Sequence, residues 1–118
     1  AGASIPADHV IDGVSLDSIH EQRVIGWHQP HQWGAPGPGI EPFTAVRQGK
    51  WKLIFFHDGA RYELYNLEKD IGETNNLVME KPLILKKLER LLKEWAKVRN
   101  AQPSILKETG KPVLWKAE

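Results

Sequence analysis

The sequence predicts an α+β fold, in which a small antiparallel sheet of about four strands carries one long amphipathic helix on one face. Three observations predict it. Apolar and polar residues alternate in several segments between residues 23 and 67, Gly-containing turns separate those segments, and residues 82–98 repeat apolar side chains at helical spacing. A chain of 118 residues, 41% hydrophobic, is long enough for one domain with a modest core.

The first part of the chain is expected to be irregular. Pro6 and the Asp12-Gly13 pair interrupt any period in residues 1–22, although the apolar stretches 10–11 and 14–16 could form a strand edge. Residues 23–28 are predicted to form the first strand of a sheet region that extends to residue 78. Residues 29–42 contain four Pro and three Gly and are therefore predicted to form a loop.

The clearest strands follow this loop, at residues 43–47, 51–56 and 61–67. In the second of them, apolar side chains fall on both faces, which predicts a central strand covered on each side. Gln48-Gly49 supplies the turn before this strand. Asp58-Gly59 after it predicts a short hairpin with a type I′ turn, because Gly accepts the positive φ that this turn requires.

Residues 70–76 form a polar, Gly-containing segment that predicts a turn. Asp70, Glu73 and Asn76 could imitate a calcium-binding loop, but their spacing does not match the twelve-residue pattern with its closing bidentate Glu. We therefore expect side chains here to cap backbone N–H groups. Leu77 and Val78 are expected to return to the core.

A helix is predicted over residues 81–100. Pro82 suits its first turn, and Pro103 follows its expected end near Asn100. Its apolar stripe consists of Ile84, Leu88, Leu91, Leu92, Trp95 and Val98. Residues 101–118 form a tail, in which residues 113–115 could add a short strand or dock on another domain.

Charge favours no nucleic-acid or membrane partner, because the net charge is only +1. The distribution is uneven, however. Residues 81–99 hold seven basic and two acidic side chains, a local charge of +5, which we interpret as a solvated helix face. No ribonucleoprotein-like motif occurs, and no apolar run approaches the roughly 20 residues of a membrane span. The start at Ala1, without Met or a visible signal peptide, favours a processed or truncated N-terminus.

The chain contains no cysteine, which excludes disulfides, thiolate metal sites and a Cys nucleophile. Its serines lack the Gly-x-Ser-x-Gly elbow, and no Gly-rich phosphate loop is present. The residues themselves therefore indicate neither a catalytic nor a metal site.

One segment does suggest binding: residues 27–33 read Trp-His-Gln-Pro-His-Gln-Trp. His28 and His31 are poor candidates for a metal pair, because Pro30 separates them and no carboxylate is near in sequence. Trp faces stack on sugar or aromatic rings, and His donates to oxyanions. The candidate ligand-binding residues are therefore Trp27, His28, His31 and Trp33, with ordinary structural packing as the alternative.

Five blocks in a fixed order resemble the C-terminal subdomain of the formylglycine-dependent, arylsulfatase-like sulfatases. The most specific are Gly-Lys-Trp-Lys-Leu at 49–53, Glu-Leu-Tyr-Asn-Leu at 63–67 and Asp-x-Gly-Glu-x-x-Asn-Leu at 70–77. The others are Ile-Asp-Gly-Val-Ser-Leu at 11–16 and Trp-His-x-Pro-His at 27–31, and the resemblance covers about residues 1–112. Ile71 departs from the pattern, since the family commonly has Pro there, which alters a turn only.

The resemblance implies a parent enzyme that hydrolyses sulfate esters and carries its active site in a large N-terminal domain. The formylglycine of this family is made from Cys or Ser in a Cys/Ser-x-Pro-x-Arg motif, which is absent here. The resemblance places the calcium ligands and the catalytic Lys and His in that domain too. We therefore expect no catalytic residue, metal ligand or cofactor in this chain, and no activity from the chain alone.

The resemblance also implies a substrate role. In similar sulfatases the C-terminal subdomain lines one side of the substrate cleft, so His28 and His31 are expected to bind sulfate or sugar hydroxyls while Trp27 and Trp33 shape the wall. The expected partners are the N-terminal catalytic domain and a sulfated small molecule or glycan, in a periplasmic or secreted setting. The alternative is a stand-alone carbohydrate- or protein-binding module that uses its Trp residues and its Pro/Gly loop.

Overall fold

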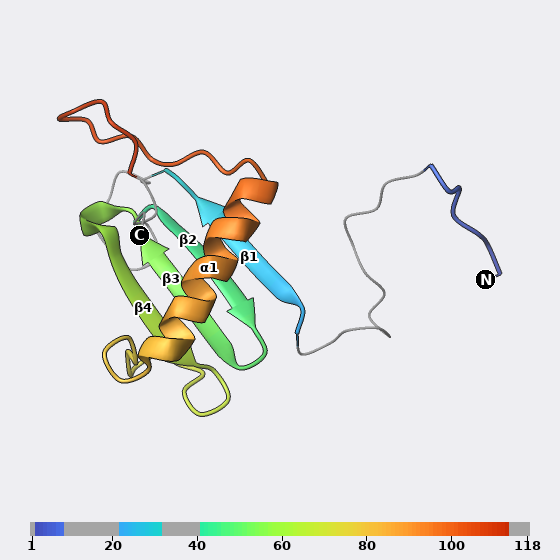
Figure 1. Ribbon diagram of the computed structural model, residues 1–118, viewed down its shortest axis with the longest axis horizontal. Helices are drawn as coiled ribbons and strands as arrows, with labels where there is room; N and C mark the ends of the chain where they lie inside the picture. The colour runs from blue at the N-terminus through green and yellow to red at the C-terminus, as the bar shows by residue number, and fades with distance from the viewer. Residues whose placement is uncertain (1, 9–21, 32–40, 114–118) are drawn as a thin grey trace.

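The computed structural model describes residues 2–8, 22–31 and 41–113 (Figure 1). Four antiparallel strands form one sheet in the order β1-β2-β3-β4, and helix α1 lies across one face of it. The elements are β1 (Val24–Gln29), β2 (Phe43–Gln48), β3 (Trp51–Phe56), β4 (Arg61–Asn66) and α1 (Pro82–Val98). The predicted α+β class, with one helix on one face of a four-stranded sheet, is confirmed.

The register separates the two faces of the sheet. Val46 pairs with Leu53 and Leu53 with Leu64, so all three point toward α1, where they are fully buried. One residue along, Ala45 pairs with Ile54, and both belong to a second apolar cluster on the opposite face. The prediction that β3 is apolar on both faces is therefore confirmed.

Helix α1 buries one stripe against the sheet. Leu88, Leu92 and Ala96 are buried, and Ile84, Leu85, Leu91 and Trp95 pack against the same core. The predicted extension of the stripe to Val98 is wrong, because that side chain is 81% exposed. Val98 is the last residue of the helix, and Trp95 and Ala96 already make the apolar contacts of the final turn.

The packing of α1 on β1 depends on Gly26. A Cβ atom at this position would lie 2.2 Å from Cε2 of Trp95, so the indole ring occupies the space that a side chain would need. The missing side chain of Gly26 therefore sets how closely the helix approaches the first strand.

Two hairpin loops differ from each other. Gln48 pairs with Trp51, and Gly49 takes a φ of 59° in the two-residue loop between them. The next loop has four residues, 57–60, because Phe56 pairs with Arg61. The predicted type I′ turn at Asp58-Gly59 is therefore wrong. Within this loop the Ala60 N–H donates to His57 O at 3.4 Å, and both Gly59 and Ala60 take a positive φ. The His57 N–H donates to Pro42 O at 2.9 Å, beyond the last β2–β3 pair, and its ring is buried.

The segment after β4 is held by side-chain caps, as predicted. The Asp70 carboxylate accepts hydrogen bonds from the backbone and hydroxyl of Thr74 and from the backbone of Asn75, and these bonds lower its pKa. Oδ1 of Asn76 accepts from the backbone N–H groups of Leu64 and Val78. Leu77 and Val78 pack against the core.

The tail turns back on itself after α1. Ile105 and Pro112 form an isolated antiparallel bridge, the Val113 N–H donates to Ser104 O at 2.8 Å, and Val113 is buried in the core. The predicted contribution of Leu114 and Trp115 lies outside the described residues, as do the apolar stretches 10–11 and 14–16. No helix in the described part of the chain is long and apolar enough to cross a membrane.

Candidate functional site

The structure describes three of the four predicted binding residues, and two of these, Trp27 and His28, lie on different faces of the sheet. Trp27 and His28 are neighbours in β1, so their side chains point to opposite faces of the sheet. Trp27 is 43% exposed on the face away from α1, and His28 lies half-buried on the α1 side. His31 is exposed just beyond the strand, and Trp33 lies outside the described residues. Their role in substrate binding stays a prediction.

Both ring nitrogens of His28 are hydrogen-bonded within the chain. Nε2 donates to the carbonyl oxygen of Gln102 at 2.7 Å, and Nδ1 lies 2.8 Å from the hydroxyl of Thr44. Thr44 is in β2, and Gln102 follows α1. His28 therefore links the first strand to the segment that leaves the helix.

The hydroxyl of Thr44 also connects His28 to a second histidine, His57. Oγ1 of Thr44 lies 2.8 Å from Nε2 of His57, and Nδ1 of His57 lies 2.6 Å from Oγ of Ser104. That Ser104 hydroxyl donates to Pro30 O at 2.8 Å. We call the four side chains His28, Thr44, His57 and Ser104 the histidine network.

A count of protons limits which hydrogen bonds of the histidine network can form together. Its five hydrogen bonds begin at one backbone carbonyl and end at another, and carbonyls only accept. Two neutral imidazoles and two hydroxyls supply four protons. All five bonds can therefore form together only when one imidazole carries a second proton.

Burial keeps His57 neutral. Its ring is 2% exposed, and burial, together with the nearby His28, lowers its pKa to about 4. Its single proton therefore lies either on Nε2, which faces Thr44, or on Nδ1, which faces Ser104.

Sequence reasoning singled out His28 but missed Thr44 and His57. Thr44 is 16 positions from His28 and 13 from His57, and Ser104 is 47 positions from His57. No local motif joins them, so only the strand register and the return of the tail bring them together.

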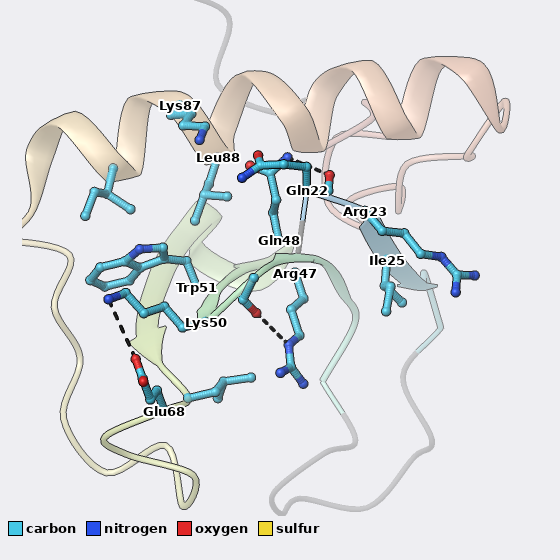
Figure 2. Close-up of a pocket in the computed structure, with 13 residues that line it drawn as sticks. Gln22, Arg23, Ile25, Arg47, Gln48, Lys50, Trp51, Glu68, Lys87 and Leu88 are labelled. Carbon is cyan, nitrogen blue, oxygen red and sulfur yellow. Dashed lines mark hydrogen bonds and ion pairs between the residues drawn. The ribbon is translucent and has the colours of Figure 1, made fainter. Parts of the chain in front are cut away.

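A second feature lies at the other end of the sheet. A groove of about 870 Å³ opens between α1 and the β2–β3 turn (Figure 2). Basic side chains dominate its polar lining: Arg23, Arg47, Lys50 and Lys87, with Glu68 as the one acidic lining residue. We call these four side chains and the space they border the basic groove.

A third feature is the sheet face opposite α1, which we call the open face. Ala45, Ile54 and Tyr65 form its centre, with Phe43, Phe56 and Leu67 packed around them. Ile25 and Trp27 continue it along β1 and are 41% and 43% exposed. Polar pairs surround it: Lys52 with Glu73, and Arg61 with Glu41 at 2.8 Å. Nε and Nη atoms of Arg61 also approach Glu63 and Glu41, whose carboxylates raise the arginine pKa.

Comparison with known proteins connects this fold to one class of enzyme. No protein-family model matches the chain. A curated sulfatase from Formosa agariphila is 27% identical over 122 aligned residues, which cover 89% of this chain and 22% of that protein. The chain thus spans about a fifth of this relative's length.

Two solved structures have the same fold. BT4656, determined in complex with its substrate D-glucosamine-2-N,6-O-disulfate, matches with a TM-score of 0.60 and 26% identity. The match covers 81% of this chain and 21% of BT4656. BT1596, a 2-O GAG sulfatase, matches with a TM-score of 0.58 and 25% identity over 84% of this chain and 22% of its own.

The four-stranded sheet with its single helix therefore matches one part of each of these sulfatases. The chain is a C-terminal part of a sulfatase.

Proposed function

We propose that this chain completes an enzyme that hydrolyses sulfate esters, by supplying a scaffold and one wall of the substrate cleft. The observation that carries the proposal is the match to BT4656, which extends over 81% of the chain with a TM-score of 0.60. The chain's similarity to sulfatases does not favour the alternative of a stand-alone binding module.

The catalytic centre is assigned to the remainder of the parent enzyme. This chain has no cysteine and no Cys/Ser-x-Pro-x-Arg motif from which formylglycine could be made. Its described residues contain no group of three His, Asp or Glu side chains that could hold a metal. The residues present therefore do not fit formylglycine or calcium, and we propose that the N-terminal domain supplies both and that this chain alone is inactive.

The open face is the surface we propose for contact with that domain. It joins an apolar centre at Ala45 and Ile54 to the exposed side chain of Trp27, and Ile25, which also lines the basic groove, marks its border. Burying apolar surface of this kind against a partner domain removes it from water and stabilises the complex. The relatives are about four times as long as this chain, since 81–89% of it covers 21–22% of them, so they have enough additional polypeptide to cover it.

The proposed substrate is a sulfated glycan or a sulfated small molecule. BT4656 binds a disulfated glucosamine, and a sulfate ester carries a negative charge that a cationic side chain stabilises. His31 is exposed just beyond β1, where a ring N–H could donate to a sulfate oxygen. We assign the enzyme to the periplasm or the exterior of the cell, which fractionation of the source cells would test.

Mixing this chain with the separately expressed catalytic domain of its parent tests the proposal. Hydrolysis of a chromogenic aryl sulfate is expected only when both are present, since each lacks part of the fold. Activity from this chain alone would contradict the proposal. Failure of the two proteins to associate would equally contradict it, because the open face would then have no such partner.

A further inference from the structure

The basic groove collects positive charge from four separate parts of the chain. Arg23 precedes β1, Arg47 ends β2, Lys50 lies in the β2–β3 turn and Lys87 is on α1. Figure 2 shows Lys87 above the groove and Arg47 and Lys50 below it. The strand register and the helix position, rather than a local run of sequence, create this concentration of charge.

Little negative charge opposes these side chains. Glu68 lies 3.7 Å from Lys50, and both side chains are largely exposed, so water weakens this pair. Arg47 donates from Nε to Gly49 O, a neutral acceptor, at 3.0 Å. Within residues 2–8, 22–31 and 41–113, no carboxylate lies within ion-pair distance of Arg23 or Lys87. The groove therefore has a net positive charge.

Helix α1 extends this charge away from the groove. Lys86, next to Lys87, begins a row that continues through Arg90, Lys93 and Lys97, on the side of the helix opposite Leu88 and Leu92. The row spans about 17 Å along the helix axis. Glu89 and Glu94 lie at i,i+4 spacing from Lys93 and Arg90 and offset part of this charge, so the four basic and two acidic side chains leave the row with a net charge of +2.

We propose that the basic groove and this row form a binding site for an extended polyanion, namely a sulfated glycan chain. The choice of a sulfated glycan rests on the proposed function, while the anion preference follows from the charges alone. The site is separate from His28, because Arg23 precedes β1 and His28 lies near its end, about 17 Å away at strand spacing. It would retain a polymeric substrate while one sulfated unit is in the cleft.

The length of the row predicts a dependence on ligand length. A disaccharide can occupy only the groove, whereas a chain of six or more sugars can also reach Arg90 and Lys97. We therefore expect affinity to rise with oligosaccharide length and to fall steeply with salt concentration, because exposed charge pairs are screened.

The test uses the 118-residue chain and a heparin-derived hexasaccharide, with binding measured by calorimetry at two NaCl concentrations. The variant R23Q/K87Q removes two groove charges and spares Arg47, whose Nε bond supports the turn. Its matched control is K107Q/K111Q, which removes two exposed charges from the tail. We expect roughly a tenfold loss of affinity for the groove variant and less than a twofold loss for the control.

A second variant, R90Q/K97Q, tests the helix row. It should weaken binding of the hexasaccharide and leave binding of a sulfated disaccharide unchanged. Equal losses for the groove variant and the tail control would overturn the proposal, since they would indicate unspecific attraction. Equally tight binding of a thymidine oligonucleotide would overturn the assignment to glycans.

These outcomes differ from those that test the proposed function. Binding is measured without turnover, and the reconstituted enzyme is assayed on a small aryl sulfate that cannot span the row. Restored hydrolysis without hexasaccharide binding would overturn the binding site alone. Hexasaccharide binding without restored hydrolysis would overturn the proposed function and support the anion site.

Discussion

The hydroxyl of Thr44 joins two imidazole rings, because it lies 2.8 Å from Nδ1 of His28 and 2.8 Å from Nε2 of His57. A hydroxyl can donate one proton only, so it donates to one ring and accepts from the other. When His28 holds both of its protons, Thr44 must donate to His57. The protonation of one ring therefore sets the tautomer of the other.

Replacing Thr44 should show how much this bridge contributes. Thr44→Val keeps the side-chain shape but removes the hydroxyl, which leaves buried ring nitrogens without their partner. An unsatisfied buried polar group costs about 1–3 kcal/mol, so we expect a loss of stability of that size in urea denaturation. Thr44→Ser, which retains the hydroxyl, is the control. A Val variant as stable as the parent chain would show that the bridge contributes nothing.

The burial of His57 predicts a pH dependence. Its pKa falls from 6.5 to about 4 on folding, so between these values the unfolded chain binds more protons than the native chain. Stability is therefore complete above pH 6.5 and declines as the pH falls toward 4, by about 3 kcal/mol at most for a shift of this size. The measurement is the urea midpoint as a function of pH.

The matched variant for this prediction is His57→Gln, which cannot titrate. Its stability should change less between pH 6.5 and pH 4 than that of the parent chain, although it is lower at neutral pH. The difference between the two curves isolates His57 from the carboxylates that titrate in the same range. Parallel curves would mean that His57 is not held neutral by the fold.

The strands and the helix could be predicted because their signals are local. Alternation in residues 51–56 gave the faces of β3 correctly, and the spacing of Leu88 and Leu92 gave the buried side of α1. Alternation also places Trp27 and His28 on opposite faces, as the register shows, while the predicted roles of these side chains in substrate binding stay predictions. Local patterns were therefore sufficient to predict which side chains a strand or a helix buries.

Other features could not be predicted from the sequence because they depend on contacts between residues far apart in the chain. The Asp58-Gly59 pair suggested a two-residue turn, but Phe56 pairs with Arg61, so the loop has four residues and places both Gly59 and Ala60 at positive φ. Val98 fits the helical period, yet the sheet offers nothing for it to pack against. The histidine network requires three strands and the tail to meet, so no spacing rule reveals it.

Asn76 provides a prediction for the segment after β4. Its Oδ1 accepts a 3.0 Å hydrogen bond from the Leu64 N–H, which belongs to a strand at the edge of the sheet. Asn76→Ala would remove this acceptor and that of Val78, with an expected loss of about 1–3 kcal/mol. Asn76→Asp retains an acceptor oxygen and should recover most of the stability. Amide hydrogen exchange at Leu64 measures the effect directly, and unchanged exchange in the Ala variant would count against this cap.

The contact between Gly26 and Trp95 gives the last prediction. In Gly26→Ala the new Cβ would lie 2.2 Å from Cε2 of the indole, so the ring or the helix must move. Overpacking of this kind costs about 1–3 kcal/mol, which urea denaturation would show as a lower midpoint with an unchanged slope. Gly72→Ala is the control, because a Cβ there would lie 3.6 Å from a methyl group of Thr74, an ordinary contact.

A second substitution separates steric conflict from loss of backbone freedom. If the indole causes the destabilisation, Gly26→Ala should cost much less in a Trp95→Leu background, since the smaller side chain leaves room for the methyl group. Two contacting residues then give a coupling energy in the double-mutant cycle. Additive effects would show instead that the indole does not press against Gly26, and that α1 is positioned on β1 by the rest of its apolar stripe.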